Sequence, residues 1–159
     1  MTAALLKNNL AHSRAAYLHA VHALPSPEGL LSGEIWQHGF VFERPDQITS
    51  QLIELGWAFF PRYEGCLEKW LKDQGVNLAK NRSLEDWLKS HKVNIPTEFS
   101  DGLRVYRKIR NALHHDDGAS LDRNQEAEIH LLPDLMERFF SLFCWVAEQV
   151  SAIPKTDRD

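Results

Sequence analysis

One short segment gathers side chains of three chemical kinds. It runs from Tyr106 to Gly118 and reads Tyr-Arg-Lys-Ile-Arg-Asn-Ala-Leu-His-His-Asp-Asp-Gly. A permanent cation, Arg110, is followed by the imidazoles of His114 and His115 and then by two carboxylates. Imidazole exchanges protons near neutral pH, and a guanidinium binds phosphate oxygens with a fork of donors. Together these groups could cleave a phosphodiester without metal, with histidine as general acid/base and arginine stabilising the charge that develops on the phosphorane.

The position of Arg110 within its helix is unusual for a cation. The 3.6-residue period predicts a helix over residues 97 to 114, with an apolar face made of Phe99, Leu103, Tyr106, Ile109 and Leu113. Arg110 lies about 20° from Phe99 around this helix, in the middle of the apolar face. Burying an unpaired cation costs several kcal/mol. Arg110 therefore either serves a site or forms an ion pair inside the bundle. Its partner would then be Glu64 or another carboxylate of the helix predicted near residues 45–75.

The neighbours of Arg110 place a geometric condition on any site. Asn111 could bind a ribose hydroxyl or hold the tautomer of a histidine. Arg110 and His115 are roughly 140° apart around an ideal helix, whereas His114 shares the face of Arg110. Arg110 and His115 converge only if the helix ends or bends near His114, or if two copies of the chain meet. Alternatively, His115 faces solvent and caps the last carbonyls of its helix.

The rest of the chain reads as helices with little strand signal. The spacing of apolar residues, together with prolines and glycines that mark helix ends, predicts helices near residues 2–23, 45–75, 83–91 and 124–152, besides 97–114. We expect a kink at Pro61, and either a kink or the true start of the last helix at Pro133. Residues 30–44 form an irregular loop or a short hairpin. The prediction is an all-α, four-to-five-helix up-down bundle over residues 1–153, followed by a disordered polar tail at 154–159.

Bulk properties narrow the class of protein. The chain has 159 residues and a net charge of -4. The negative net charge argues against binding of nucleic acid mainly by overall charge, but it allows a local basic patch. No apolar run approaches the ~20 residues of a membrane span, so we expect a soluble, cytoplasmic protein without membrane contact. Cys66 and Cys144 are expected to be buried thiols. Trp57 and Trp145 lie off the apolar faces, where they either pack under loops or form a partner surface.

Three further sets of residues are candidates for supporting roles. Glu64 lies near the edge of the apolar face of its helix and either positions Arg110 or His115 or is an ordinary surface glutamate. A basic face could follow an RNA backbone, although Glu98 and Asp101 partly offset it; it consists of Arg104, Arg107 and Lys108. Histidines and aspartates could also hold a metal, but a solvated face explains them better; they are His12, His19, His22 and the 114–117 cluster. We predict no metal and no cofactor.

The run Arg110-Asn111-Ala-Leu-His-His115 resembles the Arg-x(4-6)-His motif of HEPN domains, within a helical bundle of suitable size. The resemblance implies a dimer in which arginines and histidines of both subunits form a composite site. It also implies a metal-independent endoribonuclease, in which 2'-hydroxyl attack leaves a cyclic phosphate. His115 would be the general acid/base and Arg110 the phosphate binder, with Asn111 and His114 in support. Such proteins act as toxins or in antiviral defence, so RNA, an antitoxin or a larger defence complex are the expected partners.

The chain departs from one toxin subgroup of this family. That subgroup carries a tyrosine two residues after the histidine, which a partner nucleotidyltransferase modifies, and this chain has Asp117 there. Two other functions stay open beside the nuclease. One is a catalytically silent HEPN-like bundle that serves as an interaction module, and the other is a bundle that binds RNA or a nucleotide without hydrolysis.

Overall fold

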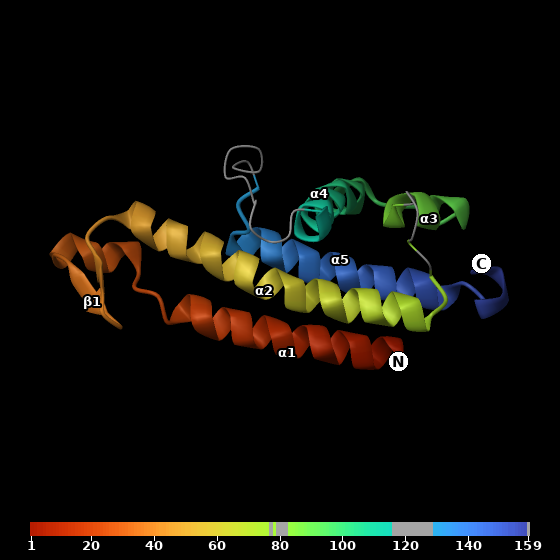
Figure 1. Ribbon diagram of the computed structural model, residues 1–159, viewed down its shortest axis with the longest axis horizontal. Coiled ribbons are helices and arrows are strands. Elements are labelled where there is room, and N and C mark those ends of the chain that lie inside the picture. The colour runs from red at the N-terminus through yellow and green to blue at the C-terminus, as the bar shows by residue number, and fades with distance from the viewer. Residues whose placement is uncertain (77, 79–82, 116–128, 159) are drawn as a thin grey trace.

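Three long helices lie side by side and form the body of the molecule (Figure 1). They are α1 (Ala3–His22), α2 (Pro45–Asp73) and α5 (Pro133–Ala152). This computed structural model describes residues 1–76, 78, 83–115 and 129–158, except the side chains of 112–115 and 157. The described chain is mostly helical, as predicted. None of its helices is both long and apolar enough to cross a membrane.

Local hydrogen bonds and a glycine explain where α1 begins and where α2 begins and ends. The Thr2 hydroxyl accepts a hydrogen bond from the Leu5 backbone N–H at 3.2 Å and caps α1. At the start of α2, the Gln47 side chain accepts from the Arg44 backbone N–H at 3.0 Å. Gly75, at φ 83°, follows the end of α2 in the left-handed conformation that glycine adopts without strain. Between these ends α2 passes through Pro61 as one helix, as predicted.

The segment between α1 and α2 contains a short hairpin. A 3-10 helix at Pro27–Ser32 leads into β1 (Ile35–Gln37), which pairs antiparallel with β2 (Phe40–Phe42). His38 and Gly39 connect the strands with φ of 50° and 80°, as a two-residue type I′ turn requires. The hairpin therefore matches the second of the two forms expected for this segment. It lies at one end of the body (Figure 1).

Two further helices pack on this body. They are α3 (Leu84–Ser90) and α4 (Thr97–His115). A capping box starts α3: Ser83 Oγ accepts from the Asp86 N–H at 3.1 Å, and the Asp86 carboxylate accepts from the Ser83 N–H at 3.3 Å.

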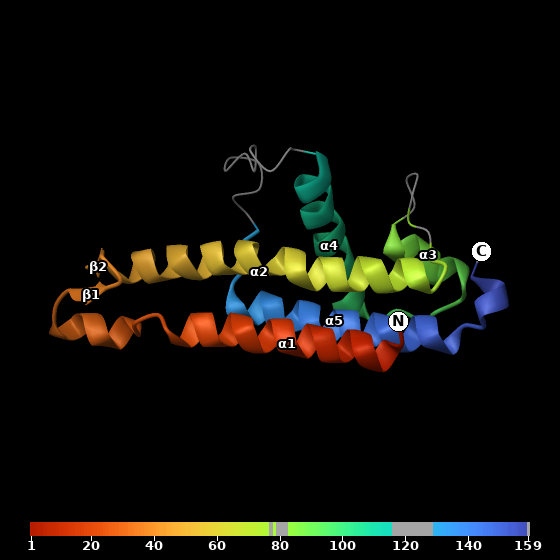
Figure 2. The ribbon, with the colours of Figure 1, turned by 60° about the horizontal axis from the view of Figure 1, so that its bottom comes forward.

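The direction of α4 differs from the expected up-down arrangement. It crosses α2 and α5 steeply instead of running alongside them (Figure 2). At the crossing, the Tyr106 ring lies 6.3 Å from the Phe60 ring of α2 and 5.2 Å from the Phe143 ring of α5. Gly102 lets α4 and α5 approach closely, because an added Cβ there would lie 3.1 Å from Leu142 Cδ2 of α5. Aromatic packing at one point, rather than a seam along the whole helix, sets this angle.

The last long helix is shorter than predicted. α5 begins at Pro133, and residues 129–132 are not helical; residues 124–128 lie outside the described chain. Pro133 therefore marks the start of the helix, where proline is well suited because its missing N–H needs no partner. Trp145 packs against Phe99 of α4 with ring centroids 4.9 Å apart. Trp57 is also partly buried against the core. Both tryptophans therefore pack against other residues of this chain.

Residues 154–158 lie against the body, in the segment for which the sequence predicted a disordered polar tail. Residues Lys155–Asp157 form a 3-10 turn. Arg158 is only 5% exposed; its Nε donates to the Ile153 carbonyl and its Nη1 to Gln74 Oε1, both at 2.9 Å. The guanidinium thus joins the C-terminus of α5 to the end of α2. Composition did not indicate this, because a terminal arginine is usually solvated.

Candidate functional site

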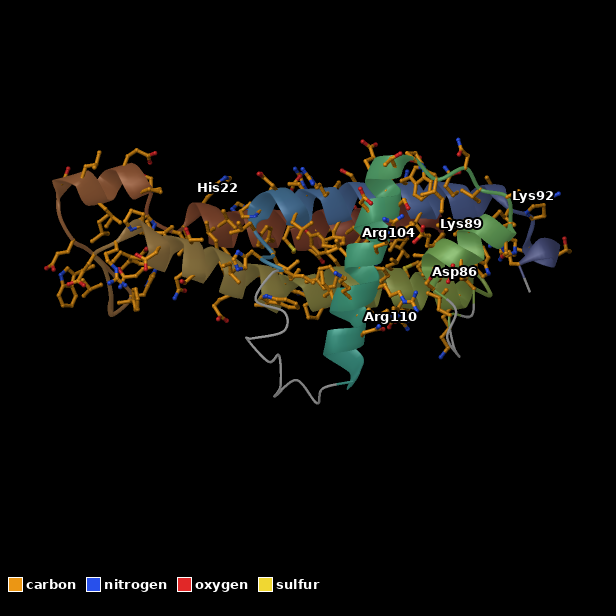
Figure 3. The ribbon with its side chains drawn as sticks, turned by 90° about the horizontal axis from the view of Figure 1, so that it is seen from above. His22, Asp86, Lys89, Lys92, Arg104 and Arg110 are labelled. Carbon is orange, nitrogen blue, oxygen red and sulfur yellow. The ribbon has the colours of Figure 1, made fainter. Side chains whose placement is uncertain are left out.

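Two carboxylates of α2 hold the guanidinium of Arg110. Arg110 Nε donates to Glu68 Oε1 at 2.8 Å and lies 3.7 Å from Glu64 Oε1. Arg110 projects from α4 where that helix crosses α2 (Figure 3). The ion pair therefore joins two helices within one chain, which is the pairing that the sequence offered as the alternative to a site.

Glu64 is not an ordinary surface glutamate. Its side chain is 7% exposed, whereas those of Glu68 and Arg110 are each 32% exposed. A carboxylate this deeply buried needs a cation or several hydrogen-bond donors beside it, and Arg110 supplies positive charge. The sequence did contain a signal for this burial. Glu64 lies four residues after Phe60 and three before Leu67, so it occupies a position that the helical period assigns to the core.

The Tyr106 hydroxyl belongs to the same cluster. Tyr106 lies one helical turn before Arg110, and its hydroxyl is buried without a hydrogen-bond partner among the described residues. Burial raises the Tyr106 pKa far above its ordinary value, and the nearby carboxylates of Glu64 and Glu68 raise it further. The phenol therefore stays neutral and keeps a proton to donate. The sequence allowed for a second carboxylate of α2 without naming Glu68, and it did not indicate this hydroxyl.

An open pocket of about 760 Å³ lies beside Arg110 and Glu68. Its other lining residues come from the C-terminal half of α2 and the segment after it: Gly65, Lys69, Leu71, Lys72, Gly75, Val76 and Leu78. Arg110 is thus held on one side by carboxylates and reaches the surface of this pocket on another. An arginine so placed can bind an anion that enters the pocket.

The structure places the remaining predicted residues of α4 as follows. Asn111 is exposed, and the helix continues without interruption through His115. The side chains of His114 and His115, and the whole of residues 116 and 117, lie outside the described part of the chain. α4 is helical as far as His115, where the described segment ends, so positions 110 and 115 are roughly 140° apart around its axis.

The predicted basic face of α4 is partly neutralised by acids. Arg104, Arg107 and Lys108 are all exposed. Arg104 pairs with Asp101 at 3.3 Å. The pKa of Asp86 on α3 is lowered first by its hydrogen bonds with Ser83 and also by the charges of Arg107 and Lys89. Arg104 and Arg107 thus already have acidic neighbours within the chain.

No group of three or more histidine, cysteine or acidic residues that could hold a metal occurs among the described residues. His22 lies at the end of α1, far from Arg110 (Figure 3). Cys66 and Cys144 are partly buried free thiols, and burial raises the pKa of each.

No protein-family model matches this chain, and neither curated proteins nor solved structures provide a match. The function must therefore be argued from the cluster around Arg110.

Proposed function

We propose that this protein is a metal-independent endoribonuclease of HEPN type. In the proposed reaction, a ribose 2'-hydroxyl attacks the adjacent phosphorus while His115 removes its proton. The bond from phosphorus to the 5'-oxygen then breaks, and that oxygen receives a proton from a histidine. The products are a 2',3'-cyclic phosphate and a 5'-hydroxyl. Arg110 binds the non-bridging phosphate oxygens, with Asn111 and His114 in support.

The observation that carries this proposal is the setting of Arg110. Its side chain is 32% exposed at the edge of a pocket, and Glu68 fixes its Nε at 2.8 Å. A cation already held in place by its supporting carboxylates loses little freedom when it binds a phosphate. Arg110 thus combines a fixed position with a surface that is open to the pocket.

A second copy of the chain is part of the proposal. Because α4 stays helical through His115, positions 110 and 115 are roughly 140° apart around its axis. The last turn of α4 extends past its crossing with α2 and away from the body (Figures 2 and 3). A homodimer could bring Arg110 of one copy toward His115 of the other.

One observation favours a second candidate function. The hydrogen bond from Arg110 to Glu68 occupies part of the guanidinium within a single chain. A catalytically silent bundle that serves as an interaction or RNA-binding module would use Arg110 in this way, to join α4 to α2. An antitoxin or a larger defence complex would then be its partner.

Cleavage of a labelled, structured RNA in the presence of EDTA tests the proposal. Wild type is compared with His115→Ala, Arg110→Ala and the control Arg138→Ala, which removes an exposed arginine of α5. We expect cleavage by wild type and by the control, products that end in cyclic phosphate, and loss of at least a hundredfold in the other two variants. A folded wild-type dimer that leaves RNA intact would refute the nuclease and favour the silent bundle.

A further inference from the structure

The outward face of α2 carries exposed cations. Arg62, Gly65, Lys69 and Lys72 follow one another at spacings of three, four and three residues, which places them on one side of the helix. All four are exposed. We call these residues the α2 strip.

The cations of the α2 strip differ from several other cations of the chain. Lys7, Arg14, Lys89 and Arg104 each form an ion pair with a glutamate or aspartate. Among the described residues, no ion pair includes the three cations of the strip. Arg62 instead lies over the Phe59 ring, with its Cζ 5.8 Å from the ring centroid. Exposed cations that form no ion pair within the described chain can bind an anionic ligand.

The strip lies along two adjoining hollows that share Gly65 and Lys69. One is the pocket of about 760 Å³ that also contains Lys72 and Arg110. The other, of about 480 Å³, contains Arg62 together with residues of α1. A Cβ added at Gly65 would meet nothing within 4 Å. The surface between the two hollows is therefore formed by the backbone of α2 at Gly65, without a covering side chain. A ligand can therefore approach α2 closely along the strip and reach Arg110.

We propose that the phosphodiester backbone of single-stranded RNA lies along the α2 strip and is led by it to Arg110. This inference rests on the proposed nuclease function and names the path of its substrate. Arg62 and Lys72 are ~15 Å apart along the helix axis at 1.5 Å per residue, which is long enough for more than one phosphate. The basic face of α4 is the less suitable path, because Asp101 and Asp86 offset the charges of Arg104 and Arg107.

Binding of a fully 2'-O-methylated RNA oligonucleotide tests this path, because that RNA cannot be cleaved by its 2'-hydroxyl. Fluorescence anisotropy gives the dissociation constant over a range of salt concentrations. Each phosphate contact on a single strand contributes about -0.7 to the slope of log K against log salt. For Lys69→Gln/Lys72→Gln we expect a slope shallower by about 1.4 and binding weaker by about tenfold at low salt. Arg107→Gln/Lys108→Gln removes the same charge from α4 and is the matched control.

A second pair of variants tests the floor of the hollow. Gly65→Glu places a carboxylate in the middle of the strip and is expected to weaken binding, whereas Gly65→Ala is expected to leave the salt slope unchanged. Circular dichroism verifies that each variant is folded.

The outcomes separate this inference from the nuclease itself. Equal losses in the α2 and α4 double variants, a larger loss in the α4 variant, or no binding by wild type would overturn the path. The expected slopes together with an absence of cleavage would support the path and refute the nuclease.

Discussion

At the scale of single residues, Arg110 and Glu64 depend on each other. Glu64 is nearly buried and Arg110 lies 3.7 Å from it, so either charge left alone would be poorly solvated. The pair therefore complicates a simple test of catalysis. Loss of activity in an Arg110 variant has to be separated from loss of folding.

We expect Arg110→Ala to lower the free energy of unfolding by about 1–3 kcal/mol, because Glu68 loses its hydrogen-bonded cation and Glu64 loses the positive charge beside it. Adding Glu64→Gln should restore part of this loss, since a neutral amide is less costly to bury than a carboxylate. Urea unfolding of both single variants and the double variant measures the coupling. Strictly additive losses would mean that Arg110 does not compensate the charge of Glu64.

Glu85 should make stability depend on pH in the acid range. Its hydrogen bond with Lys89 is the largest cause that holds its pKa below the ordinary value of 4.5, and Ser100 of α4 contributes as well. A lowered pKa in the folded state means that the stabilisation is present above pH 4.5 and is lost as pH falls through the folded pKa.

Wild type should therefore be more stable than Glu85→Gln at neutral pH, by about 1 kcal/mol or less, and the difference should shrink to nothing in strong acid. Thermal melts of both proteins from pH 7 downward, at constant ionic strength, measure it. A difference that is independent of pH would show that the carboxylate charge of Glu85 is not what stabilises the α3–α4 junction.

At the scale of elements, what the sequence predicted well is what local chemistry decides. Thr2, Pro45 and Ser83 mark helix starts through caps and fixed φ angles, and these starts appeared where expected. The crossing of α4 was not predicted, because it depends on which aromatic rings meet between helices far apart in the sequence. The hydrogen bond from Arg158 to Gln74 likewise joins residues far apart in the sequence. For the site, Arg110 stood out by its position, but Glu68 became recognisable only once α4 lay across α2.

Two glycines of α2 should respond in opposite ways to alanine. Gly65 is exposed, and an added Cβ meets nothing within 4 Å, so Gly65→Ala should stabilise by about 0.5–1 kcal/mol through helix propensity. Gly56 is buried, and a Cβ there would lie 2.6 Å from Leu131 Cβ and still closer to the Leu131 carbonyl oxygen. Gly56→Ala should therefore destabilise by several kcal/mol, because backbone would have to move.

Thermal and urea unfolding of the two glycine variants compare them directly. A stable Gly56→Ala protein would show that the segment before α5 does not rest on α2 as the structure places it. A destabilised Gly65→Ala protein would point instead to a contact on the α2 strip.

At the scale of the whole molecule, the three tyrosines of the chain report on the integrity of the bundle. Tyr17, Tyr63 and Tyr106 come from α1, α2 and α4, and all are buried in the shared core. Their hydroxyls have no hydrogen-bond partner among the described residues. Solvent can therefore reach a phenol only when helices separate.

The tyrosines should ionise only as the protein unfolds. Burial raises the pKa of Tyr17 to about 12 and also raises the pKa values of Tyr63 and Tyr106. Because the folded pKa values exceed the unfolded value of about 10, the folded state keeps its full stability below that pH and loses it as pH rises further. Tyrosinate absorbance should stay flat through pH 10 and then rise in one step, together with the loss of helical circular dichroism. A gradual rise near pH 10 with helicity intact would mean that at least one phenol is open to solvent, and that α1, α2 and α4 do not enclose a common core.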